Sequence, residues 1–145
     1  MRRLRRFLRL TTLRRRLVVL AAALFWLTRL LMLFRSFHSA RRALSVLITT
    51  AKRAFPIHGG APPGDLAWAV ATAGRLSSRN CLIRALAAQA LVELQGGKAR
   101  LVIGTRRNLT GALEAHAWLE HDGRIIVGAH DDHFVTMARF ERTGA

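Results

Sequence analysis

The single cysteine of the chain, Cys81, is the residue most suited to act as a nucleophile. Ser78 or Asn80 offers a helix cap just before it, and the apolar run 81–95 predicts a helix, so Cys81 would lie in its first turn. Free backbone N–H groups and the positive end of the helix dipole favour a thiolate there, and they can stabilise an oxyanion. A buried, inert thiol is the competing interpretation of a lone cysteine.

His116 offers the base that a thiol nucleophile requires. Apolar and polar residues alternate through 114–120, which predicts a strand with His116, Trp118 and Glu120 on one face. We expect this strand to lie against the helix of Cys81, with the imidazole directed toward the thiol. A structural histidine with satisfied ring nitrogens is the alternative.

A third group, normally acidic, should orient the imidazole. Asp122-Gly123 is a strong signal for a two-residue hairpin turn, and the resulting register pairs His116 with Ala129. Asp131 is then the nearest acid and shares a face with Ala129, whereas Asp132 points the other way in a continuing strand. We predict Asp131 as the third member, with both aspartates as plain loop residues in the alternative reading.

The sequence predicts neither a metal nor a cofactor. Residues 130–133 (HDDH) could join His116 or His121 around a metal, but two histidines three apart suit a helical turn better than a loop. One cysteine excludes a multi-cysteine zinc or iron–sulfur site and an intrachain disulfide framework. The common glycine-rich phosphate and dinucleotide loops are absent.

The surrounding pattern predicts an α+β fold in which a buried central helix packs on a small antiparallel sheet. Gly96-Gly97 ends the central helix, and the strands are expected in a meander. The expected strands are 99–105, 112–120, 124–128 and 134–140. The expected earlier helices are 17–34, 39–55 and 66–76, the last capped by Asp65.

Charge divides the 145 residues unevenly. The formal net charge is +16, and residues 1–64 hold 14 Lys and Arg without a single acid. Residues 65–145 hold 10 Lys and Arg and 8 acids, an ordinary balance. We therefore predict a basic head at 1–16, a helical region with its glycine- and proline-rich linker at 17–64, and the core domain at 65–145.

The apolar run 17–34 is nearly long enough to span a bilayer, yet it contains Arg29 and is basic at both ends. It also resembles the apolar part of a secretory signal, but no Ala-x-Ala-like cleavage site follows. We expect a cytoplasmic chain whose apolar helix packs inside the protein or on a partner, with contact to a membrane surface as the alternative.

With these motifs together, the sequence resembles the lasso-peptide leader peptidases, the microcin-processing family of transglutaminase-like cysteine peptidases. The resemblance covers about residues 17–140. It rests on Cys81-Leu82 opening an Ala/Leu-rich helix, on Gly96-Gly97, on the segment 101–104 (LVIG), and on the segment 116–120 (HAWLE) followed by Asp122-Gly123.

The resemblance implies a transglutaminase-like or papain-like core, with Cys81 as nucleophile and His116 as base. The acidic member in the family lies on the strand after the hairpin, where this sequence has residues 127–129 (VGA). The implied activity is removal of the leader from a ribosomally made lasso precursor peptide. The implied partners are a small leader-recognition protein and an ATP-using macrolactam synthetase.

Two other classes of function compete with a peptidase. The chain could be a basic, membrane-associated adaptor that uses residues 1–64 while Cys81 is inert. It could also bind nucleic acid through its arginine-rich head, but it lacks a recognisable nucleic-acid fold and a stacking platform of interleaved aromatics. We therefore expect no nucleic-acid partner.

Overall fold

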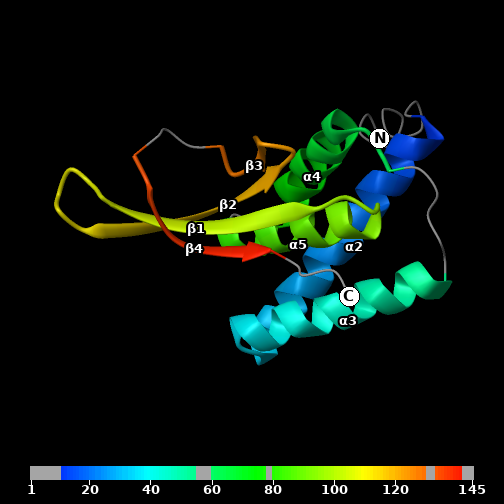
Figure 1. Cartoon of the computed structure of the whole chain (residues 1–145), viewed down its shortest axis with the longest axis horizontal. Coiled ribbons are helices and arrows are strands. Elements are labelled where there is room, and N and C mark those ends of the chain that lie inside the picture. Colours follow the sequence, from blue (N-terminus) through cyan, green and yellow to red (C-terminus); the bar gives the residue numbers. More distant parts are fainter. Residues whose placement is uncertain (1–10, 55–59, 78–79, 130–132, 142–145) are drawn as a thin grey trace.

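The computed structural model describes residues 11–54, 60–77, 80–129 and 133–141, which form helices followed by one antiparallel sheet. The α+β plan predicted from the sequence is confirmed (Figure 1). The elements are α2 (Thr12–Phe34), α3 (Phe37–Ala54), α4 (Pro63–Ser77), α5 (Cys81–Leu94), β1 (Ala99–Arg107), β2 (Leu113–His121), β3 (Arg124–Val127) and β4 (Val135–Glu141).

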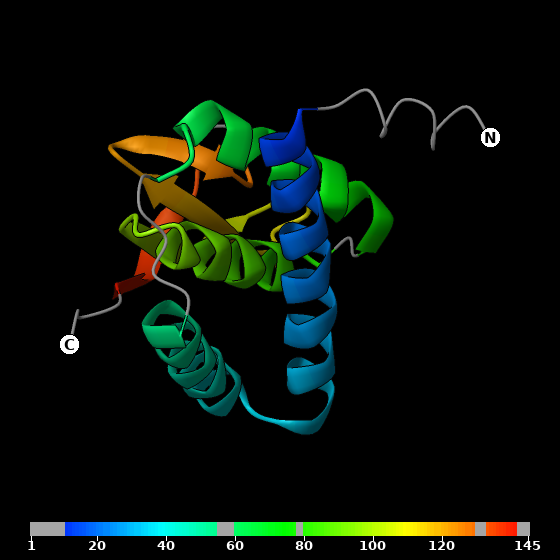
Figure 2. The same ribbon diagram turned by 90° about the vertical axis from the view of Figure 1, so that its right-hand side faces the viewer.

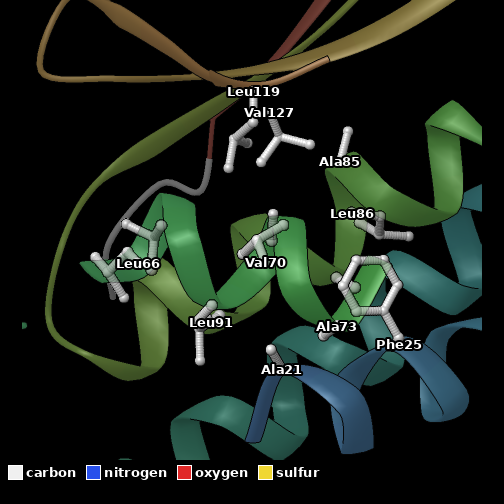
Figure 3. Packing of buried hydrophobic residues seen from close by; sticks show 14 of the residues in the cluster. Ala21, Phe25, Leu66, Val70, Ala73, Ala85, Leu86, Leu91, Leu119 and Val127 are labelled. Carbon is white, nitrogen blue, oxygen red and sulfur yellow. The ribbon is translucent and has the colours of Figure 1, made fainter. Parts of the chain in front are cut away.

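Helix α5 is the centre of the fold, as its apolar composition predicts. It packs on the sheet, on α2, on α3 and on α4, and its residues from Ala85 to Glu93 are all buried. Figure 3 shows Ala85 beside Val127 and Leu119 of the sheet, and Leu86 beside Phe25 of α2. Gly96 ends the helix with a φ of 83°, a conformation that glycine adopts without strain.

Helix α2 begins at Thr12, five residues before the predicted start, because Thr11 caps it by accepting a hydrogen bond from the Arg14 amide. One face is part of the core, where Leu17, Ala21 and Phe25 are almost completely buried. By length and composition alone α2 could cross a membrane, but core helices of soluble proteins and signal sequences meet the same criteria. The core packing shows that one face of α2 already has protein neighbours.

The start of α4 differs from the prediction. The helix begins at Pro63 instead of Leu66, since proline suits the first helical position, where no backbone donor is needed. Asp65 therefore lies in the first turn and is not the cap. Its carboxylate accepts a hydrogen bond from Nε of Arg14 at 2.8 Å, which ties α4 to the start of α2.

The strand order β3-β2-β1-β4 corrects the predicted meander. Strand β4 pairs with the free edge of β1, so the chain crosses the sheet after β3 instead of adding β4 beside it. This order brings the Phe140 ring of β4 to 5.1 Å from the Phe37 ring of α3. It also brings Phe134, just before β4, against the aromatic residues of β2.

The β2–β3 hairpin forms at Asp122-Gly123 as predicted, with positive φ at both residues. Its register is wrong in the prediction, because a bulge shifts the pairing between Glu120 and Leu119. Leu119 pairs with Val127, where β3 ends, so His116 has no pairing with Ala129.

Phe25→Ala tests whether α2 belongs to the core. We expect the free energy of unfolding to fall by about 3 to 5 kcal/mol, because the substitution leaves a cavity against α5. The control is Leu33→Ala on the exposed side of the same helix, expected to change stability by less than about 0.5 kcal/mol. Urea denaturation followed by circular dichroism measures both, and equal effects would contradict the packing.

Candidate active site

Cys81 is the first residue of α5, as the sequence predicts. Of the two candidate caps, Asn80 is the one that the structure shows: its side-chain oxygen accepts from the amides of Leu82 at 3.0 Å and Ile83 at 3.3 Å. Ser78 lies outside the described residues. The cap fixes the helix start, but it also uses two amides that could have held an oxyanion. An oxyanion at Cys81 would therefore need the Cys81 amide itself or a donor from elsewhere.

The Cys81 side chain is partly buried and packs against the hydrophobic core. This environment leaves the thiol in contact with both the core and the surface of the molecule. It differs from that of a fully enclosed structural cysteine, which would be closed to a substrate.

The imidazole of His116 is oriented by a backbone carbonyl. Its Nε2 lies 2.9 Å from the oxygen of Gly128, and because a carbonyl only accepts, Nε2–H is the donor. In the neutral ring Nδ1 then carries no hydrogen, and it is the ring nitrogen that could take a proton. Gly128 has a φ of 76°, and a Cβ there would lie 2.7 Å from the Ala117 carbonyl, so the close approach requires glycine.

Aromatic rings enclose His116 on the face that it shares with Trp118. The two rings stack with centroids 6.3 Å apart, and Phe134 lies 5.3 Å from the imidazole. Trp118 is buried over Gly104 and donates from Nε1 to Glu120 at 3.0 Å. The common face of His116, Trp118 and Glu120 is therefore confirmed, and its packing holds the imidazole in place.

This face is the one opposite α5. Ala117 and Leu119 of β2 lie in the core that contains α5, and successive strand residues point to opposite sides. The structure thus corrects part of the expectation: β2 packs on the helix of Cys81, but the His116 imidazole is on the far side of the strand from α5.

Cys81 and His116 nevertheless belong to two elements that pack on each other, α5 and β2. Figure 3 shows Ala85 beside Val127 of β3, and Cys81 precedes Ala85 by four residues, or about 6 Å of helix. Among the described residues, β3 pairs with β2 only as far as Leu119, and His116 pairs with Gly104 of β1.

The predicted third member, Asp131, lies outside the described residues, as do Asp132 and His130. The orienting group that the structure does show, the Gly128 carbonyl, was missed by sequence reasoning. Its only sequence signal is a glycine directly after the return strand. Within the described ranges, no group of three His, Cys, Asp or Glu side chains could hold a metal ion.

Two surface hollows are lined in part by residues of α3 and α5. One of about 470 Å³ is lined by Arg41, Arg42 and Glu93 among others. The second, of about 700 Å³, continues toward the end of β2, and both contain Glu93 and Ile48. Neither hollow includes Cys81 or His116 in its lining.

Comparison with known proteins gives one result. A family model described as the transglutaminase-like superfamily matches residues 7–139, nearly the whole chain. No curated protein and no solved structure matches significantly.

Asn80→Ala tests the capped start of α5. We expect the free energy of unfolding to fall by about 1 kcal/mol, because two amides lose their acceptor. Asn80→Asp keeps an oxygen at the same place and serves as the control, with stability close to wild type. Thermal unfolding followed by circular dichroism compares the two. An equal fall in the free energy of unfolding in both variants would show that the side-chain oxygen at residue 80 does not stabilise the start of α5.

Proposed function

The chain belongs to the transglutaminase-like superfamily, and from this premise we propose that it is a cysteine peptidase that removes the leader from a ribosomally made lasso precursor peptide. The observation that carries the proposal is the family match over residues 7–139, which includes a cysteine at the start of the central helix and a histidine on the adjoining strand. The family match lends no support to the alternative, a membrane adaptor without catalytic activity.

In the proposed reaction His116 takes the proton of the Cys81 thiol, and the resulting thiolate attacks the carbonyl at the leader–core junction and expels the amine of the core peptide. His116 protonates that leaving amine, and the product is a thioester between the leader and Cys81. His116 then removes a proton from water, which hydrolyses the thioester and releases the leader acid and the free thiol. The helix dipole of α5 favours the thiolate in both steps.

Because Nε2 donates to the Gly128 carbonyl, we propose Nδ1 as the atom of His116 that exchanges protons in the reaction. The reaction requires Nδ1 and the thiol to meet around the edge of β2, where β3 has already ended. A backbone carbonyl can fix the tautomer as a carboxylate does, although it adds less electrostatic stabilisation to the imidazolium. An acid after β3, for which Asp131 is the predicted residue, would add that stabilisation.

The proposed partners follow from the chemistry of the product. Leader removal frees the amine that a ring-closing step must acylate, so an ATP-using macrolactam synthetase is the proposed next enzyme. A separate leader-recognition protein is the proposed means of delivering the precursor. We place the reaction in the cytoplasm, where the precursor is made.

Cys81→Ala and His116→Ala test the catalytic assignments. With the precursor peptide from the same gene cluster and the leader-recognition protein present, we expect Cys81→Ala to abolish cleavage. His116→Ala should slow it by at least about 100-fold, the usual contribution of general acid–base catalysis. Mass spectrometry of the released leader measures both rates.

His38→Ala is the matched control, because His38 is an exposed histidine on α3, away from β2. It should cleave at the wild-type rate. Circular dichroism must show that all three variants fold. Normal cleavage by folded Cys81→Ala would rule out the proposed mechanism, whereas loss of cleavage in His38→Ala as well would point to a general defect.

A further inference from the structure

Helix α2 carries a second apolar stripe that the fold does not cover. It consists of Val19, Ala23, Trp26, Leu30 and Leu33, spaced alternately four and three residues apart, with Phe34 next to it. That spacing keeps residues on one side of a helix. The large members are all more than half exposed, and Phe34 is 80% exposed. We call these six residues the α2 stripe.

The α2 stripe lies opposite the face that holds α2 in the core. Leu17, Val18, Ala21, Phe25 and Thr28 are the buried residues of the helix, and they lie about half a turn away from the stripe. Figure 2 shows the first half of α2 against α4 and α5, and the second half extending beyond the body to meet α3. A contiguous apolar surface of this kind on a folded domain marks a contact site.

The charge around the α2 stripe selects its occupant. Arg16 and Arg29 flank it and are exposed, and the Arg29 guanidinium lies 5.6 Å from the Trp26 ring centroid. No acid occurs before Asp65 in the sequence, and residues 1–64 hold 14 Lys and Arg. Two copies of this surface would therefore repel each other, whereas an anionic lipid headgroup layer complements it.

We propose that α2 lies flat on an anionic bilayer, with the α2 stripe in the acyl boundary and Arg16 and Arg29 at the headgroups. The Trp26–Arg29 pair suits this position, since indole rings favour the membrane interface and arginine can extend its charge to the headgroups. This contact is independent of the peptidase proposal and would hold the domain at a membrane surface.

The packing of α2 opposes a transmembrane arrangement. A spanning helix would have to leave the core, exposing the surfaces of α4 and α5 that its buried face now covers. It would also place Arg29 deep in the hydrocarbon, at a high cost. When α2 lies on the membrane surface, its buried face stays packed in the core while the α2 stripe contacts lipid.

Co-sedimentation of the full chain with vesicles tests the proposal. We expect binding to vesicles of phosphatidylcholine with phosphatidylglycerol, and weak binding to phosphatidylcholine alone. Binding to the anionic vesicles should weaken as salt is raised. The double variant Leu30→Ser/Leu33→Ser should bind them at least about tenfold more weakly, because it loses the apolar contact but no charge.

The matched control is Leu109→Ser/Leu113→Ser, which removes two leucines of the β1–β2 hairpin that are at least as exposed as Leu30 and Leu33. It should bind vesicles as the wild type does. Tryptophan emission should shift to the blue on binding, and Trp26→Phe should lose that shift. Both double variants should keep the wild-type circular dichroism.

Four results would each overturn the proposal. Wild-type binding by the α2 double variant would show that charge alone attracts the chain, and equal binding to neutral vesicles would remove the role of charge. Resistance to extraction by alkaline carbonate would show a spanning helix. A lipid-free dimer that the α2 double variant dissociates would show that a second copy covers the stripe.

Discussion

The packing of α5 along β1 and β2 is the constraint on which the rest of the structure depends. Small buried residues such as Ala85 and Ala88 let the helix lie close to the sheet. In the β1–β2 register, Gly104 of β1 and His116 of β2 face each other. Any chemistry that combines Cys81 with His116 depends on this contact between α5 and β2.

The far face of the sheet is as important for His116 as the helix is for Cys81. The crossing from β3 to β4 brings Phe134 against Trp118 and His116. The Trp118 ring lies so close to β1 that residue 104 must be glycine, because a Cβ there would lie 2.8 Å from the ring. The stacked rings and the Gly128 carbonyl together leave the imidazole few orientations. Side chains held in this way exchange protons with little reorganisation, a condition that effective acid–base groups share.

Sequence reasoning succeeded wherever a local signal decided the structure. Short local stretches of sequence account for four features: the cap at Asn80, the helix from Cys81, the strand around His116 and the turn at Asp122-Gly123. It failed where the outcome depends on distant partners. A one-residue bulge in β3 has no sequence signal of its own, yet it shifts every residue placed beside His116. The strand order places Phe134 against Trp118 and Phe140 against Phe37, and no local sequence pattern encodes these contacts between distant segments.

Helix α2 carries apolar residues on two opposite sides, and the two sides have different surroundings. An amphipathic helix on a domain surface normally has a polar outer face, and a transmembrane helix is apolar all round. In α2 the inner side packs on α5, and the outer side carries an apolar stripe bordered by arginines. The mean hydropathy of α2 averages its two sides and is as high as that of a membrane-spanning helix. Only the burial pattern therefore distinguishes α2 from a helix that spans a membrane. The core contacts fix the direction in which the outer side points, and this lets a single helix serve both the fold and a contact outside it.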